Sequence, residues 1–302
     1  MSQNMAAFGD LEGLPLERPQ GYRLMAKSLV SNGALMLGLT VAAAICLAAI
    51  LAPWVSPVDP LTQDLSARLK PPVWTSAGSS VHLLGTDQFG RDVLSRLIYG
   101  ARYSLTIAIT ATLIAGVVGT LFAVLAGYVG GRIGTVVMRA ADIQLALDAV
   151  LLALIVVAVY GPSLLALTLV LAAVGWSNYT RVLYGVVQSL RSQEYVSAAR
   201  SMGASQRQII VWHVLSNLIP PVIVLTTLQV ARVLLLAAGL SFLGLGVADP
   251  QPSWGGMLAD GQKYIYSAWW LITLPGVLIT ITVGSINLMG SGLGRMVDPH
   301  SR

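Results

Sequence analysis

The chain has 302 residues, of which 55% are hydrophobic and only 10% are charged. A soluble protein of this length would carry about a quarter charged residues, so the composition excludes an ordinary soluble domain and indicates a membrane protein. The formal net charge of +5 does not indicate nucleic-acid binding, because the basic residues lie between apolar runs and form no stripe with interleaved aromatics. The positive-inside rule for membrane proteins accounts for this charge.

Residues 1–30 are predicted to form a cytoplasmic tail, and residues 31–55 the first transmembrane helix. This apolar run is longer than the hydrophobic part of a signal peptide and should remain as an anchor. The only cysteine, Cys46, lies in the run and is interpreted as a packing residue, since it has no partner for a disulfide or a metal site.

A polar segment over 56–101 is predicted to lie in the periplasm and to end in an interfacial helix. Four of its charged residues recur at helical spacing and are expected to form ion pairs. They are Asp87, Arg91, Asp92 and Arg96.

Five further apolar runs predict spans at about 102–128, 137–160, 163–187, 218–245 and 268–289. They form a core over 102–290, followed by a tail over 291–302. With both termini in the cytoplasm, eleven Lys and Arg residues lie inside and six outside, while Arg232 lies within a span. The sequence therefore predicts an all-α polytopic membrane protein with six transmembrane helices and cytoplasmic N and C termini.

The loop over 188–217 is predicted to form a helix, a glycine turn and a second helix at the cytoplasmic face. Gly203 provides a turn without a side-chain penalty. Ala198 and Ala199 have small side chains and are expected to let a partner approach the first helix closely. Glu194 near the start of that helix suits the helix dipole. From the residues alone, a site that transmits force from a partner and an ordinary helical hairpin are equally good interpretations.

Several segments resemble one family, the permeases of dipeptide, oligopeptide and nickel ABC importers, in the subunit usually called C-type. They are residues 83–105 (LLGTDQFGRDVLSRLIYGARYSL), 194–205 (EYVSAARSMGAS), 239–246 (GLSFLGLG), 251–261 (QPSWGGMLADG) and, in part, 287–299. Ser197, Ala237 and Asp148 stand where the family pattern usually has Glu, Glu and Pro.

The resemblance implies a type I ABC-importer permease fold and an ATPase-coupling role for the loop over 188–217. The loop residues that carry this role by resemblance are Glu194, Tyr195, Ala198, Ala199, Arg200, Gly203, Ala204 and Ser205. The implied partners are a B-type permease subunit, two ABC ATPase subunits, a periplasmic or lipid-anchored solute-binding protein and membrane lipid. The implied location is the bacterial inner (cytoplasmic) membrane.

The sequence predicts a transport subunit without an ATPase site of its own. No Gly-Lys pair exists in the chain, so it contains no Walker A motif, and ATP and Mg are expected on the partner ATPases. The chain itself is expected to carry no cofactor and no metal, because His82, His213 and His300 are predicted on both sides of the membrane and cannot form one site.

Asp148, Gln229 and Arg232 are the candidate residues of a translocation path. A charge in mid-bilayer costs roughly 2.5–3.5 kcal/mol on insertion scales, so it normally faces a cavity or a partner. In the predicted spans Asp148 and Arg232 lie at similar depths, about 17 and 21 Å from the cytoplasmic side at ~1.5 Å per residue. Both a salt bridge and a polar lining of the path are open interpretations.

The expected function is half of a path for peptides, or for a peptide-like or nickel-chelate solute, driven by separate ATPases. One alternative is a permease of the same family for another small solute. A second is an ion-coupled secondary transporter using Asp148 and Arg232, and a third is an intramembrane hydrolase. The hydrolase would need a histidine at the depth of Ser241 or Ser285, whereas all three histidines are predicted outside the spans.

Overall fold

The structure, a computed structural model, describes residues 33–76, 78 and 80–297, and these residues form helices and one isolated β-bridge, between Thr86 and Asp92. The predicted tail over 1–30 and the end of the tail over 291–302 lie outside the described residues. The helices before the polar loop are α2 (Gly33–Ile50), α3 (Ala52–Val55) and the short η3 (Leu65–Ala67). Those that follow are α4 (Val93–Val124), η4 (Leu125–Val129), α5 (Gly131–Ala146), α6 (Ala149–Tyr160), α7 (Leu164–Arg191), α8 (Glu194–Ser201), α9 (Gln206–Gln208), η5 (Ile209–Leu215), α10 (Ser216–Phe242), α11 (Trp254–Gln262) and α12 (Trp270–Val297).

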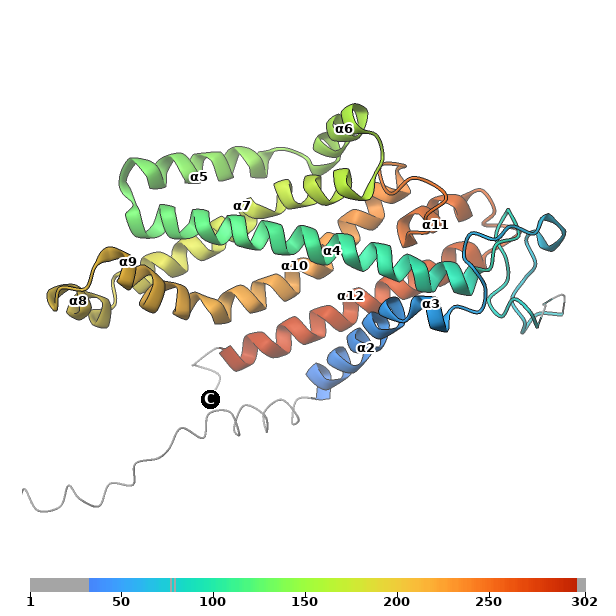
Figure 1. Cartoon of the computed structure of the whole chain (residues 1–302), viewed down its shortest axis with the longest axis horizontal. Coiled ribbons are helices and arrows are strands. Elements are labelled where there is room, and N and C mark those ends of the chain that lie inside the picture. The colour runs from blue at the N-terminus through green and yellow to red at the C-terminus, as the bar shows by residue number, and fades with distance from the viewer. Residues whose placement is uncertain (1–32, 77, 79, 298–302) are drawn as a thin grey trace, which may run out of the picture.

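The long helices α4, α7, α10 and α12 run along the long axis of the molecule (Figure 1). The short helices α8 and α9 lie at one end of this bundle, which we call the α8 end. Helix α11 and the polar loop over 56–92 lie at the opposite end, the α11 end. The polar connections are thus gathered at the two ends, as the predicted membrane protein requires.

Four helical runs are long and apolar enough to cross a membrane, namely Gly33–Ile50, Val93–Val129, Gln206–Phe242 and Trp270–Met296. The pair α5 and α6 makes a fifth if the two helices, bent by 86°, count as one span. Helix α7 is long enough, with 28 residues, but is not among these runs. Its second half carries Asn178, Thr180 and Arg181, which lower its hydropathy.

The second span begins at Val93 rather than near residue 102. Asp92 caps the helix, because its Oδ2 accepts hydrogen bonds from the Ser95 backbone N–H at 2.8 Å and from the Ser95 hydroxyl at 2.7 Å. The helix predicted at the interface before residue 102 is therefore the first part of α4. At the other terminus, α12 continues to Val297, so the part of the predicted tail over 291–297 is helical.

The span predicted at 137–160 is not one straight helix, because the chain breaks and bends between α5 and α6 at Leu147 and Asp148. Asp148 has an extended backbone and caps α6, accepting hydrogen bonds from the N–H groups of Val150 at 2.7 Å and Leu151 at 3.4 Å. Aspartate competes with the helical backbone for hydrogen bonds and therefore favours a cap over a helix interior.

Helices α4 and α7 pack closely because of a glycine. A Cβ at Gly119 would lie 2.4 Å from the Tyr179 Cβ and 2.5 Å from the Trp176 carbonyl oxygen. The Thr180 hydroxyl donates to the Gly119 carbonyl at 3.1 Å, and the Tyr179 hydroxyl donates to the Thr226 hydroxyl of α10 at 3.0 Å. Two polar residues of α7, Tyr179 and Thr180, thus form hydrogen bonds to neighbouring helices inside the bundle.

The buried side chains form two clusters, one toward each end of the bundle. Trp254 of α11, which is fully buried, belongs to the cluster at the α11 end, and its indole N–H donates to the Leu97 carbonyl at 3.0 Å. The cluster at the α8 end contains Val196 of α8 and Ile209 of η5, together with Leu183 of α7. Each end of the bundle therefore has its short helix anchored in its own core.

Candidate functional site

The loop predicted to be a helix, a turn and a helix has this form over residues 194–215, which we call the hairpin segment. Helix α8 ends at Ser201, and Gly203 follows with φ +87°, a conformation that favours glycine. The Gly203 N–H donates to the Arg200 carbonyl and the Ala204 N–H donates to the Ala199 carbonyl, both at 3.1 Å. These two bonds are those of a Schellman motif, which satisfies the last carbonyls of a helix.

The second helix of the hairpin segment has a capping box. The Ser205 hydroxyl accepts from the Gln208 N–H at 3.3 Å, and the Gln208 side-chain oxygen accepts from the Ser205 N–H at 2.8 Å. A left-handed glycine followed directly by a capping box gives the turn little freedom. The hairpin segment is therefore a rigid element rather than a loose loop.

The hairpin segment has a buried face and an exposed face. Val196 and Ala199 are buried in the cluster at the α8 end. Tyr195, Ala198 and Arg200 are exposed, and Ala204 is partly buried. Beyond these, Met202 is 82% exposed and Trp212 is 72% exposed. Met202 lies in the turn, whereas Trp212 lies in η5, at the start of a run that is apolar enough to cross a membrane.

The hairpin segment is joined to three long helices. Its second helix continues through η5, a π-helix, directly into α10. The Tyr128 hydroxyl of η4, another π-helix at the end of α4, donates to the Gln206 side-chain oxygen at 2.6 Å. The Arg191 guanidinium at the end of α7 lies 5.9 Å from the centre of the Tyr128 ring. The hairpin segment is thus continuous with α10, hydrogen-bonded to the end of α4 and close in the chain to the end of α7.

Of the candidate path residues, Gln229 and Arg232 lie one turn apart on α10, and Asp148 lies at the start of α6. Asp148 and Arg232 are exposed, while Gln229 is 6% exposed. The Arg232 guanidinium donates to the Asn178 side-chain oxygen at 3.4 Å, and Asp148 caps α6. Within the described part of the chain, no ion pair joins Asp148 to Arg232.

The α11 end carries a buried group of charges. Arg91, Arg96 and Asp87 are 2%, 2% and 5% exposed. The Asp87 Oδ2 lies 2.6 Å from the Arg91 Nε and 3.5 Å from the Arg96 Nε, while the Asp260 carboxylate of α11 lies 3.8 and 3.7 Å from the two guanidinium groups. The predicted pairing of Asp87 with Arg91 is present, although in a turn rather than in a helix.

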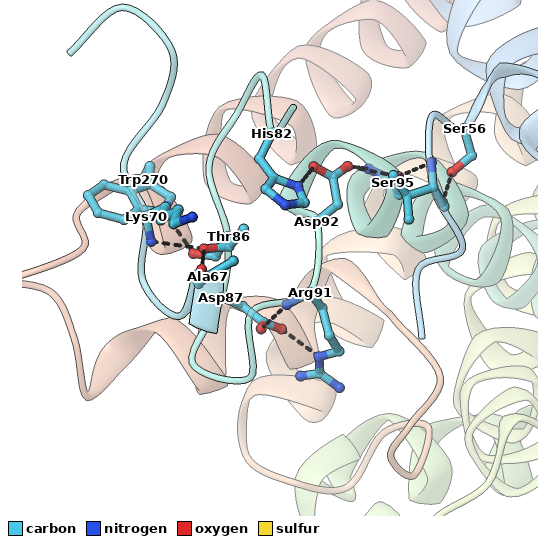
Figure 2. A network of polar contacts seen from close by, with 11 residues as sticks. Ser56, Ala67, Lys70, His82, Thr86, Asp87, Arg91, Asp92, Ser95 and Trp270 are labelled. Atoms are coloured by element: carbon cyan, nitrogen blue, oxygen red, sulfur yellow. Dashed lines mark hydrogen bonds and ion pairs between the residues drawn. The ribbon is translucent and has the colours of Figure 1, made fainter. Parts of the chain in front are cut away.

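Figure 2 shows how Asp87, Arg91 and Asp92 hold the polar loop. Asp92 lies between His82, whose Nδ1 is 3.0 Å from its Oδ1, and Ser95, whose hydroxyl donates to its Oδ2 at 2.7 Å (Figure 2). Both His82 and Ser95 thus contact the same carboxylate, and the carboxylate stands between them. A serine is activated when a histidine lies between the serine and the carboxylate, and this arrangement is different. The network fastens the loop to the start of α4.

Among the described residues, no group of three or more His, Cys, Asp or Glu side chains could hold a metal ion. The features that the sequence did not predict are the two π-helices, the bond between Tyr128 and Gln206, and the position of Asp260 beside Arg91 and Arg96. The π-helices have no local sequence signature, and the other two features join residues that are far apart in the chain.

The structure is a bundle of long apolar helices with a partly exposed hairpin at one end, which is the architecture of a polytopic membrane protein. Residues 119–302 match the family described as binding-protein-dependent transport system inner membrane component. Residues 22–72 match the N-terminal TM domain of oligopeptide transport permease C. The chain belongs to this family of inner-membrane components, and it is a multi-pass inner-membrane permease subunit of a binding-protein-dependent ABC importer.

Similar curated proteins agree with this family. The chain is 42% identical over 281 residues, 93% of both chains, to the di/tripeptide transport system permease protein DppC of Pseudomonas aeruginosa (strain UCBPP-PA14). It is 40% identical over 268 residues, 89% of both chains, to the dipeptide transport system permease protein DppC of Escherichia coli (strain K12). A solved chain of the MetNI methionine ABC transporter in an inward-facing conformation has a TM-score of 0.57 and 18% identity, covering 68% of this chain and 97% of that chain. This last likeness concerns the fold alone.

Proposed function

We propose that this chain forms half of the translocation path for dipeptides and tripeptides. The other half is a B-type permease subunit, two ABC ATPase subunits supply ATP and Mg chemistry, and a periplasmic or lipid-anchored solute-binding protein delivers the peptide. The substrate class rests on relatives that are named for dipeptide and di/tripeptide transport and span nearly the whole chain. Longer peptides and nickel chelates are the wider possibilities of the family.

We propose further that the hairpin segment is the site that the ATPases grip. The observation that carries this proposal is its construction, a capped and rigid turn with Met202 and Trp212 exposed and with direct connections to α4, α7 and α10. The proposed contact residues are the exposed Glu194, Tyr195, Ala198, Arg200, Gly203 and Ser205, with the partly buried Ala204. Ala199, which the sequence placed on the same surface, is buried and supports α8 from the inner side. ATP binding would move two such hairpins and the attached helices as rigid bodies, and so open the path on the other side.

The proposed topology has six spans, with α2, α4, α7, α10 and α12 each counted as one and the bent pair α5 and α6 as another. Counting α7 is supported by the burial of Tyr179 and Thr180 against α4 and α10, which keeps these polar groups away from lipid. The start of α2 and the end of α12 are the ends of these two helices that lie away from α11 (Figure 1), which supports N and C termini on the side of the membrane opposite to α11. The proposed divisions are tails over 1–30 and 291–302, a first helix over 31–55, a periplasmic segment over 56–101 and a core over 102–290. Asp148, Gln229 and Arg232 stay candidate path residues.

Reconstitution tests the transport function. Vesicles containing this chain, the B-type permease and the ATPases should take up a labelled dipeptide when ATP and the binding protein are supplied. Vesicles lacking the B-type permease should take up none, since half of the path is missing. ATP-dependent uptake by this chain without a second permease would contradict the assignment.

Cysteine labelling tests the topology. In a Cys46→Ser background, a membrane-impermeant maleimide should label Met202→Cys only from the cytoplasmic side, because Met202 lies in the exposed turn of the hairpin segment. Tyr266→Cys is the matched control, since Tyr266 is fully exposed near the α11 end and should be labelled only from outside. The opposite pattern would reverse the orientation.

A further inference from the structure

A wide cavity of about 1130 Å³ lies where η4, the start of α5 and the end of α7 meet, at the α8 end of the bundle (Figure 1). Three of its lining residues are arginines, Arg132 and Arg139 on α5 and Arg191 at the end of α7. All three are exposed, so a ligand can reach their guanidinium groups. Pockets that hold small organic ligands measure about 300–1,000 Å³, so this cationic cavity has room for such a group.

The positive charge of the cationic cavity is not neutralised by the chain. Among the described residues that line it, Asp142 is the only acid, and its Oδ1 lies 3.5 Å from the guanidinium of Arg181, which is not part of the lining. The three lining arginines take part in no ion pair within the part of the chain that the structure describes. The cavity therefore attracts an anionic ligand.

The backbone beside these arginines favours an anion as well. Gly130 and Gly131 have φ of +69° and +57°, and they turn the chain from η4 into α5. No side chain of the described residues caps α5, so its first N–H groups are left for another acceptor. An added Cβ at Gly130 would lie 3.2 Å from the Arg191 Nη1, which places this guanidinium close to the turn. An anion bound there would meet both the arginine and the positive end of the α5 dipole.

The arginines of α5 alternate with exposed apolar side chains. Four residues spaced by four, three and four positions lie on one stripe of the helix, namely Arg132, Val136, Arg139 and Ile143. Val136 is 67% exposed and Ile143 is 66% exposed. Exposed apolar surface is unfavourable in water and favourable against acyl chains. A soluble anion would use only the charges of this stripe, whereas a phospholipid would use the charges and the apolar side chains together.

We propose that the cationic cavity binds an anionic phospholipid, with the phosphate at the three arginines and an acyl chain along the apolar residues of the stripe. Basic pockets between transmembrane helices on the cytoplasmic side are suited to such headgroups, and the α8 end is the end proposed to face the cytoplasm. None of the candidate path residues or proposed ATPase contacts lines the cavity, so this site goes beyond the proposed function. Arg191 also lies 5.9 Å from the centre of the Tyr128 ring, whose hydroxyl bonds to Gln206, so the lipid would lie beside the connection to the hairpin segment.

Lipid titration followed by native mass spectrometry tests this site. The complex is purified through a tag on this chain, stripped of lipid in detergent, and titrated with phosphatidylglycerol, which is anionic, or phosphatidylethanolamine, which is zwitterionic. Phosphatidylglycerol should bind at least about 10-fold more tightly, because the zwitterionic lipid brings no net charge to the three arginines. Glycerol phosphate carries the anionic group without acyl chains, and the same concentration of it should not displace the bound lipid.

Arg139→Gln should weaken the binding of phosphatidylglycerol by about 10-fold to 100-fold, the usual effect of losing a hydrogen bond to a charged group. Arg207→Gln is the matched control, because Arg207 is also an exposed arginine at the α8 end and does not line the cavity. General attraction between a basic surface and an anionic lipid amounts to about 5-fold per arginine and would act equally on both variants. Arg132→Gln replaces Arg139→Gln if that variant fails to assemble.

Four results would each overturn the site. They are equal binding of the two lipids, equal weakening by Arg139→Gln and Arg207→Gln, displacement of the lipid by glycerol phosphate, and no bound phosphatidylglycerol at all. The third result would indicate a soluble anion as the ligand, and the fourth would indicate that another subunit covers the cavity. Lipid binding is measured without transport, so a failure of the proposed peptide import leaves this test intact.

Discussion

Gly203 offers the sharpest test of the coupling role. Its φ of +87° is unfavourable for other residues, yet an added Cβ would meet no atom within 4 Å. The cost of a substitution therefore comes from the backbone and not from a clash. A left-handed conformation costs an ordinary L-residue roughly 1–2 kcal/mol, which favours alternative turn geometries by about 5-fold to 30-fold.

Three substitutions of Gly203 should follow the order of that cost. Asparagine visits the left-handed region more readily than alanine, and valine is further restricted by its branched Cβ. In the reconstituted complex, we expect the amount of dipeptide transported per ATP hydrolysed to fall in the order Asn, Ala, Val. Membrane insertion should be retained, because the turn lies outside the candidate spans.

Gly161→Val is the matched control. Gly161 has φ +76° and ψ 166°, a region open essentially to glycine only, and a Cβ there would also meet no atom within 4 Å. It lies in the turn between α6 and α7, away from the hairpin segment. Its substitution should lower the yield of folded complex without lowering transport per ATP. A wild-type ratio in Gly203→Val, or an equal fall in both variants, would refute the coupling role.

Three further outcomes are expected. Tyr128→Phe should lower the stimulation of ATPase activity by the loaded binding protein and reduce stability by only about 0.5–1.5 kcal/mol, the usual value of one hydrogen bond; unchanged stimulation would argue against this connection. The losses of unfolding free energy caused by Asp148→Ala and Arg232→Gln should add to within ~0.5 kcal/mol in the double variant, because the two side chains are not paired. A double variant that is more stable than this sum would reveal a pair. Burial raises the pKa of the Asp260 carboxyl, and the negative charge of Asp249 raises it further. The folded protein therefore binds the proton of this carboxyl more tightly than the unfolded chain does, and ionisation of Asp260 lowers stability as pH rises through its pKa. The melting temperature of the wild type relative to Asp260→Asn should therefore rise as pH falls from about 7 to about 4, and a constant difference would contradict the effect of burial and Asp249.

Local patterns in the sequence determined much of this protein. Runs of apolar residues determine the helices, since a segment in lipid must satisfy its own backbone hydrogen bonds. The turn at Gly203 and its rigid construction also depend on neighbours in the chain, because the Schellman bonds and the capping box of Ser205 join residues three to five positions apart. Such features can be read from a short window of sequence.

The tertiary structure alone decided which polar residues are exposed and which are buried. Thr180 interrupts an apolar run in the sequence, yet it is buried because its hydroxyl reaches the carbonyl of Gly119 on another helix. Asp148 fits the middle of a predicted span, but the free N–H groups at the start of α6 make it a cap. Asp260 lies beside Arg91 only because α11 folds back onto the start of α4. The energy of each of these groups depends on partners far away in the chain, and no local pattern records where those partners lie.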